Sequence, residues 1–379
     1  MRTVGAILEP RIRVARPALP ALERFAGVLA DVWDRAMLSN DGPCARDFEQ
    51  AFADYRGGRG HVLAASNCDV ALTLLLAALE LPRGSRALVA SFGFPSTLHA
   101  LEWNGLQPHF VDVDAHDWCL HAKQLDGQLD GVSVIVATHM FGVPCEVTAL
   151  EDVAAERGIK LVLDAAQAVG TWVGERHVTD FGDASAISFS GTKIVTAAEG
   201  AIVVLRDERC AERFRQLRNY GMNSQGISEQ LGLNAKISEL HAALGVLTLE
   251  ELEAQIDLRG QLVDAYRQQL AHREDVALQR VPPGSRPTPT FFVADVGGAR
   301  DRVRAALAER GIESRPYFPP LHRMPRFASV SRASLPVTER LGDGLLALPL
   351  YSGLDPAVVV EVCEVIGMSL DRVAAPDGM

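Results

Sequence analysis

The chain has 379 residues, which is more than one domain of about 100 to 200 residues needs and suits a large domain with a smaller companion. Hydrophobic residues make up 48% and charged residues 22%, so the composition excludes a largely disordered chain and a fibrous repeat. Forty-eight acidic against 37 basic residues give a net charge of −11, which disfavours anionic partners such as nucleic acids and acidic membranes.

The spacing of the cysteines and the sequence of the N-terminus indicate the cellular compartment and whether a metal site is expected. The six cysteines lie far apart, without a Cys-x-x-Cys pair or a His cluster at zinc-ligand spacing, so we expect reduced thiols and no metal site. Arg2 and Arg11 occupy an N-terminus that has no basic end followed by an apolar stretch. No run approaches the roughly 18 apolar residues of a membrane span. These features predict a cytoplasmic protein.

An amphipathic helix is expected first. Apolar residues recur at steps of three and four from Leu22 to Trp33, and the pattern stops at the turn of residues 39–43. A short helix around Phe48 and Phe52 follows. Short β-rich runs then alternate with helical stretches, at residues 87–90, 109–113, 132–137, 160–163, 184–189 and 201–204. Such alternation implies crossover connections and a mostly parallel sheet covered on both faces.

The second half of the chain has a different pattern. Residues 237–270 read as a long helix with one buried stripe, which would link two domains. After a Pro- and Gly-rich stretch, a smaller α+β pattern follows, with a strand at 291–296 and helices at 301–310 and 356–366. We therefore expect an N-terminal helical segment (1–36), a large domain (37–250) and a small C-terminal domain with the linking helix (251–379).

Polar residues that follow strands are candidate site residues, because ligands of open α/β sheets bind outside the carboxyl ends of the strands. Asp164 closes an apolar strand, and Gln167 follows three residues later. A strand-end Asp often does no more than cap the next helix. The functional interpretation is an anion set against a protonated heterocyclic nitrogen, as in sites for pyridoxal phosphate (PLP).

Lys193 ends the Gly-, Ser- and Thr-rich turn that begins at Ser188. A lysine in a loop is usually a solvated surface charge. Beside a buried strand, however, an amine can lose its proton and attack an aldehyde. Ser188 and Thr192 could bind a phosphate or make ordinary turn hydrogen bonds.

A third candidate site lies at the start of the apolar helix expected over residues 70–81. Asn67, Cys68 and Asp69 precede this helix. A helix N-terminus presents unpaired N–H groups and the positive end of a dipole, so it can hold a phosphate without a basic side chain. Asp69 is equally well explained as an N-cap.

Taken in order along nearly the whole chain, these segments resemble the DegT family of fold type I PLP-dependent sugar aminotransferases. The motifs that carry the resemblance are Ser91-Phe-Gly-Phe-Pro-Ser-Thr97, Phe110-Val-Asp-Val-Asp114, Asp164-Ala-Ala-Gln167, Ser188 to Lys193, Arg218-Asn-Tyr-Gly221, Asn234 to Gly245 and Tyr317-Phe-Pro-Pro-Leu-His322. The resemblance implies an α/β fold type I PLP-transferase. Its large domain would hold a mostly parallel seven-stranded sheet sandwiched by helices, beside a small C-terminal α+β domain.

The resemblance also implies roles for single residues. Lys193 would hold PLP as a Schiff base and act as general base and acid, and Asp164 would pair with the pyridine nitrogen. Gln167 would hydrogen-bond the phenolic oxygen, and Ser188 would bind the phosphate. Phe94 would stack on the ring, with a core aromatic as the alternative.

Two further features concern the phosphate and the subunits. Where the family usually places Gly-Thr, this chain has Cys68-Asp69, and a carboxylate near a phosphate costs Coulomb energy. We therefore expect the backbone N–H groups at Asn67, Cys68 and Asp69 to bind the phosphate. Asn234 belongs to a family motif contributed across a dimer interface, which implies a homodimer with the active site at the interface, although a lone Asn is also a common turn residue.

The implied reaction uses glutamate as amino donor, pyridoxamine phosphate as intermediate and a nucleotide-linked keto sugar as acceptor. A dTDP-linked 4-keto-6-deoxyhexose is our specific expectation, because the segments that start at Trp103 and Asn234 resemble family members that make 4-amino sugars. A cyclitol ketone aminotransferase and a catalytically silent PLP-binding regulatory protein stay open as alternatives. A dehydratase of the same fold is disfavoured, since that branch has histidine in place of Lys193.

Overall fold

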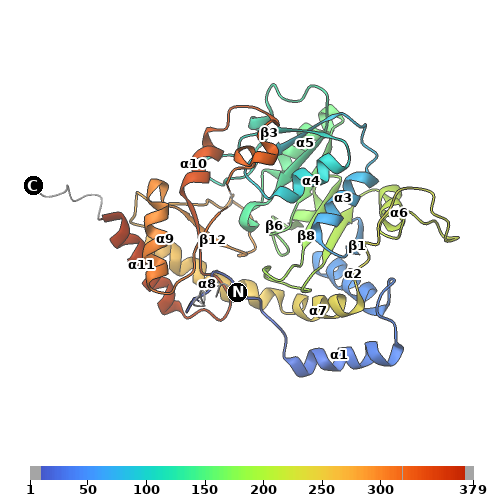
Figure 1. Cartoon of the computed structure of the whole chain (residues 1–379), viewed down its shortest axis with the longest axis horizontal. Helices are drawn as coiled ribbons and strands as arrows, with labels where there is room; N and C mark the ends of the chain where they lie inside the picture. The colour runs from blue at the N-terminus through green and yellow to red at the C-terminus, as the bar shows by residue number, and fades with distance from the viewer. Residues whose placement is uncertain (1–9, 318, 372–379) are drawn as a thin grey trace, which may run out of the picture.

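The computed structural model of the chain describes residues 10–317 and 319–371, and an eight-stranded sheet forms its centre (Figure 1). In spatial order the strands are β1 (His61–Ala65), β9 (Ala201–Leu205), β8 (Ala184–Ser188), β5 (Lys160–Asp164), β4 (Val132–Thr138), β2 (Arg86–Ala90), β3 (Gln107–Val111) and β14 (Ser331–Arg332). The pairs from β8 to β14 are parallel. Only β9 runs antiparallel to both of its neighbours among these described strands.

Both faces of this sheet are buried, as the apolar strands require. Val89 of β2 packs in a core with α3 (Cys68–Ala78), α4 (Pro95–Trp103) and α6 (Glu208–Leu217). Its neighbour Leu88 points to the opposite face and packs in a second core with α5 (Val147–Arg157). The alternation follows from the period of two along a strand. The sheet is therefore sandwiched between helices.

A third core packs three helices, two of them N-terminal, against β1, β8 and β9. It contains residues of α1 (Leu22–Arg35), α2 (Pro43–Arg56) and α7 (Glu239–Leu249). The fully buried Glu239 accepts hydrogen bonds from the backbone N–H groups of Cys44 (2.9 Å) and Ala45 (3.1 Å). These are orphan donors of the first turn of α2. A side chain of α7 thereby caps α2.

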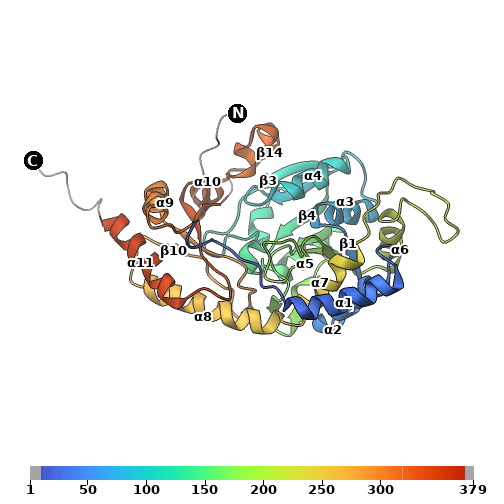
Figure 2. The same cartoon turned by 60° about the horizontal axis from the view of Figure 1, so that its bottom comes forward.

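The C-terminal part has its own sheet and its own core. Its strands are β10 (Ala277–Leu278), β12 (Phe292–Asp295), β15 (Leu345–Leu348) and β13 (Arg315–Pro316), and its helices are α8 (Leu252–Leu270), α9 (Arg300–Glu309), α10 (Pro336–Gly344) and α11 (Pro356–Asp371). Tyr266 of α8 stacks on Phe292 of β12 with ring centres 4.3 Å apart. In both views α9 and α11 lie at one end of the molecule, α10 lies nearer the large sheet, and α8 extends from that end toward the large sheet (Figures 1 and 2).

Short elements complete the described chain. A three-stranded sheet contains β11 (Ser285–Arg286), β6 (Trp172–Val173) and β7 (Arg176–His177). The 3₁₀ helices are η1 (Ala122–Leu125), η2 (Met140–Gly142), η3 (Val178–Asp180), η4 (Gly297–Ala299), η5 (Leu321–Arg323) and η6 (Pro325–Phe327). Over the described ranges, we find no helix with the length and apolar character that a membrane span needs.

The mostly parallel sheet between helices is confirmed, with two differences in detail. The sheet has eight strands instead of seven, because the two-residue strand β14 from the C-terminal part pairs with β3. The single helix expected over residues 237–270 is two helices, α7 and α8, which meet at Glu250 and Glu251. Residues 1–9 of the expected N-terminal segment lie outside the described residues, and the domain boundaries stay a prediction.

Candidate active site

A pocket of about 840 Å³ opens where the parallel strands end. Thr138, Asp164 and Ser188 are the last residues of the strands β4, β5 and β8, and all three line the pocket. This is the edge at which an open α/β sheet binds its ligands. The wall also includes residues of the C-terminal part, such as Tyr317 and Ala347.

Lys193 lies in the turn after β8 and lines this pocket. Its backbone N–H donates to the carbonyl of Ser190 (3.0 Å), which closes the turn. Burial lowers the pKa of the Lys193 amine, against the opposing effects of Cys68 and Asp164. Since the neutral amine is the nucleophilic form, this environment favours attack on an aldehyde.

Asp164 is buried, and both of its carboxylate oxygens are engaged. Thr97 donates to Oδ2 (2.9 Å), and the backbone N–H of Ala166 donates to Oδ1 (3.1 Å). Burial raises the pKa of Asp164, while these two hydrogen bonds and the charge of Lys193 lower it. A protonated ring nitrogen beside the carboxylate would add a further interaction that favours the anion.

Gln167 is held between two groups. Its Oε1 accepts a hydrogen bond from the backbone N–H of Phe141 (2.8 Å), and its Nε2 donates to the hydroxyl of Tyr317 (3.0 Å). Gln167 and Tyr317 both line the pocket. The side chain is therefore oriented by the protein itself.

The start of α3 forms another part of the wall. The N-cap is Asn67, whose side chain accepts from the backbone N–H of Val70 (3.0 Å), so Asp69 is not the cap. Ser96 of α4 donates to the carboxylate of Asp69 (2.6 Å). Asn67, Cys68, Asp69 and Ser96 all line the pocket.

These side chains fit PLP. Lys193 offers an amine for the aldehyde, and Asp164 offers a carboxylate for the ring nitrogen. The hydroxyl of Ser188 and the N-terminus of α3 offer neutral donors for the phosphate. Phe94, at the N-cap of α4, lines the same pocket and is 46% exposed, so it is not a core aromatic.

Asn234 does not belong to this pocket within one chain. It is exposed, and it forms an isolated antiparallel bridge with Asn219 in the segment after α6. The structure thus brings together Asn67, Cys68, Asp69, Phe94, Asp164, Gln167, Ser188 and Lys193, and it leaves Asn234 apart.

Three side chains that hydrogen-bond to the predicted site residues had no role assigned from the sequence: Ser96, Thr97 and Tyr317. Each lies in a motif that carries the family resemblance, at residues 91–97 and 317–322. Thr97 contacts Asp164, and Tyr317 contacts Gln167. Their positions in these motifs could have marked them as site residues. The contacts themselves could not be predicted, because the partners lie far apart in the sequence.

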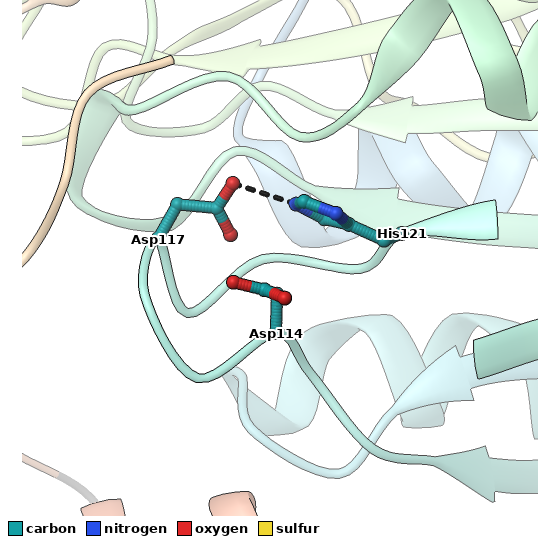
Figure 3. Close-up of side chains that lie close together, drawn as sticks. All are labelled: Asp114, Asp117 and His121. Atoms are coloured by element: carbon teal, nitrogen blue, oxygen red, sulfur yellow. Dashed lines mark hydrogen bonds and ion pairs between the residues drawn. The ribbon is translucent and has the colours of Figure 1, made fainter. Parts of the chain in front are cut away.

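A second group of polar side chains lies outside the pocket, in the loop after β3 (Figure 3). Asp114, Asp117 and His121 have potential metal-ligand atoms within 4.8 Å of one another. His121 Nε2 lies 2.6 Å from the Asp117 carboxylate, and Lys123 forms an ion pair with Asp114. Contacts within the loop therefore already use these carboxylates, as the backbone N–H groups of His116 and Cys119 also donate to them.

Comparison with known proteins identifies the family. The model of the DegT/DnrJ/EryC1/StrS aminotransferase family matches residues 22–367. The chain belongs to this family. It is similar to GDP-perosamine synthase of Caulobacter vibrioides (31% identity, covering 93% of this chain and 96% of the relative). It is also similar to the dTDP-4-amino-4,6-dideoxy-D-glucose transaminase of Escherichia coli (28% identity, 94% and 98% covered).

Solved structures agree with this assignment. The structure of DesI in the presence of its TDP-sugar product has a TM-score of 0.89 to this chain at 32% identity, with 96% of this chain and 94% of that chain covered. DesV of S. venezuelae, in complex with a ketimine intermediate, has a TM-score of 0.86 at 26% identity, with 94% and 99% covered. This family member is a PLP-dependent aminotransferase with the fold type I architecture.

Proposed function

We propose that this aminotransferase moves the amino group of glutamate to a keto sugar linked to a nucleotide. The observation that carries the proposal is the pairing of Lys193 and Asp164 in one pocket at the strand ends. The pocket volume of about 840 Å³ lies in the upper range of small-molecule sites. Relatives named for GDP-perosamine, dTDP-amino sugars and a TDP-sugar product support the acceptor class.

Within that class we propose a 4-keto-6-deoxyhexose on dTDP as the acceptor. The dTDP-4-amino-4,6-dideoxy-D-glucose transaminase and DesI support the thymidine nucleotide by their names. The GDP-perosamine synthase is named for a different nucleotide. The base is therefore the part of this proposal that a substrate panel has to decide.

We assign the following roles to the residues of the pocket. Lys193 binds the cofactor covalently and then, as a free amine, moves a proton to and from the reacting carbon. Asp164, held by Thr97, keeps the proton on the ring nitrogen. Bound PLP supplies the electron sink for the bonds at the amino-bearing carbon.

The remaining residues position the cofactor. Ser188 and the backbone N–H groups at the start of α3 bind the phosphate, where a helix N-terminus favours an anion. Phe94 covers one face of the ring. Gln167 donates to the phenolic oxygen.

We also propose that the active form is a homodimer in which Asn234 reaches the partner's pocket. The segment between α6 and α7 projects from the end of the molecule opposite the C-terminal part (Figures 1 and 2). It exposes Ile227 (55%), Leu231 (93%) and Leu233 (46%). A projecting apolar segment of this kind is typical of an interface.

A substrate panel tests the acceptor. The PLP-loaded protein is given glutamate and dTDP-, GDP- or UDP-linked 4-keto-6-deoxyhexoses, and the products are identified by mass spectrometry. We expect amination of the dTDP sugar, with no product from the same sugar without a nucleotide. Amination of a free cyclitol ketone in place of every nucleotide sugar would refute the proposal.

The amino donor is tested by the absorption spectrum alone. Glutamate should convert the visible band of bound PLP to that of pyridoxamine phosphate in the absence of any sugar. A band that does not move would indicate a protein that binds PLP without turnover.

A further inference from the structure

The contacts of Gln167 define which end of its amide faces the pocket. A side-chain amide can be turned by 180°, and the hydrogen-bond network decides which end carries the oxygen. The backbone N–H of Phe141 can only donate, and it lies 2.8 Å from the Gln167 side chain. The oxygen must therefore face Phe141, so the NH₂ group faces Tyr317 at 3.0 Å.

Phe141, which orients the Gln167 amide, has an uncommon backbone conformation. Its φ of 58° and ψ of 18° lie in the left-handed region, which residues with a side chain rarely adopt. The same residue directs its N–H to Gln167 and packs its ring edge-on against Tyr317, with ring centres 4.4 Å apart. Phe141 thus contacts both members of the Gln167–Tyr317 pair.

The segments before and after Tyr317 in the sequence are both fixed by hydrogen bonds. On one side, Arg315 and Pro316 pair with β15. On the other, the backbone N–H of Leu321 donates to the carbonyl of Ser91 (2.8 Å), and the Ser91 hydroxyl lies 2.8 Å from His322 Nδ1. The hydroxyl of Tyr317 therefore reaches Gln167 from a segment held by β15 on one side and by the residue after β2 on the other.

The hydroxyl of Tyr317 is neutral at working pH. Burial raises the pKa of Tyr317 to about 12, although the hydrogen bond with Gln167 lowers it. A neutral hydroxyl can accept one hydrogen from the Gln167 amide, whose nitrogen carries two. The second hydrogen is then available to the pocket.

We propose that Tyr317 is a positioning residue, which fixes the Gln167 amide so that one N–H donates to the phenolic oxygen of PLP. This inference rests on the proposed placement of PLP on Lys193. Tyr317 follows β13 of the C-terminal part, and Gln167 lies in the loop after β5 of the large sheet. The charge on the phenolic oxygen of bound PLP therefore depends on a hydrogen bond between the C-terminal part and the large domain.

The hydrogen bond from Gln167 should affect the visible absorption band of bound PLP. A donor to the phenolic oxygen withdraws negative charge that would otherwise hold the proton on the neighbouring imine nitrogen. Loss of that donor should raise the pH at which the visible band of bound PLP changes. A net hydrogen bond of about 1 kcal/mol corresponds to a rise of about 0.7 pH unit.

The test is a pH titration of the absorption spectrum of the PLP-loaded enzyme. We expect Tyr317→Phe and Gln167→Leu each to raise the midpoint, and Tyr317→Phe to add nothing once Gln167→Leu is present. Tyr266→Phe is the matched control: its hydroxyl is also buried and donates to the carbonyl of Pro349 (3.0 Å), but it does not line the pocket. It should leave the midpoint unchanged.

Three results would overturn the inference: an unchanged midpoint in Tyr317→Phe, an unchanged midpoint in Gln167→Leu, or equal shifts from Tyr317→Phe with and without Gln167. If Tyr317→Phe does not fold, Tyr317→Leu, which also lacks the hydroxyl, provides the same test. Borohydride reduction separates this failure from that of the proposed function. PLP trapped on Lys193 with an unchanged midpoint in Tyr317→Phe alone removes only the role of Tyr317. An unchanged midpoint in Gln167→Leu removes the donation by Gln167 as well, and PLP on another residue removes the placement itself.

Discussion

Lys193 and Asp164 have opposite charges, and burial acts on both of them. It lowers the pKa of the lysine and raises that of the aspartic acid, so each group is driven toward its neutral form, while their mutual attraction opposes this. The proposed chemistry needs one neutral and one charged group. Lys193 must be neutral to attack an aldehyde, and Asp164 must be anionic to keep a proton on the ring nitrogen. Thr97 and the backbone N–H of Ala166 favour the anion of Asp164 by hydrogen bonds.

Asp164→Asn tests the charge at this position. The amide keeps the shape of the side chain but cannot keep the ring nitrogen protonated, so we expect the rate of the glutamate half-reaction to fall roughly 100-fold or more. Stopped-flow absorption measures this rate directly. The exposed Asp126→Asn should have the wild-type rate, and a wild-type rate in Asp164→Asn would exclude the assigned role.

The order of strands and helices explains which parts of the site the sequence could predict. Asp164, Ser188 and Lys193 follow apolar runs, and the carboxyl ends of parallel strands share one edge, so their proximity follows from local patterns. Tyr317 could not be placed on Gln167 in this way, because that contact depends on how the C-terminal part packs on the large sheet.

The main layers of the fold could also be predicted from the sequence, but some details could not. Alternating strands and helices indicated the covered, mostly parallel sheet, and the structure confirms it. The break between α7 and α8 was missed because it falls at Glu250 and Glu251, which are good helix formers, and residues 246–259 contain no Gly or Pro to mark a stop. β14 is only two residues long and leaves no periodic signal.

The junction of α2 and α7 depends on one buried carboxylate. Glu239→Ala would leave the backbone N–H groups of Cys44 and Ala45 without their acceptor. We expect a loss of roughly 2 kcal/mol or more in the free energy of unfolding, measured by chemical denaturation. The exposed Glu212→Ala serves as control, and equal stability of the two variants would contradict this reading.

The loop after β3 should make stability depend on pH. Burial lowers the pKa of His121, but the hydrogen bond and charge of Asp117 prevail and raise it. A raised folded-state pKa means that the pair stabilises the fold below the unfolded pKa of histidine and loses this effect as pH rises through the folded value. We expect His121→Ala to cost about 1 kcal/mol at about pH 5.5 and less at about pH 8.5. A larger cost at the higher pH, in thermal melts, would show that the pair does not act through charge.

The pocket is built from parts of the chain that lie far apart in the sequence. The N-terminal residues Val14 and Ala15, the large sheet and the C-terminal strands β13 and β15 all contribute to its wall. The proposed dimer adds Asn234 from a second chain, since this residue lies outside the pocket of its own chain. Assembly and activity should therefore be linked.

Leu231→Asp tests this link. Leu231 is 93% exposed in the single chain, so an aspartate there should leave the fold intact but oppose burial between subunits. We expect a monomer in sedimentation velocity with weakened PLP binding. Val360→Asp, a 39% exposed position on α11, is the control and should stay dimeric. A natural-sequence monomer with full activity would contradict the shared site.

The most direct measurement is borohydride reduction of the PLP-loaded enzyme, followed by peptide mapping of the trapped pyridoxyl group. We expect one labelled peptide, with the group on Lys193, and no label after glutamate has converted the cofactor. A pyridoxyl group found on any other residue would contradict it.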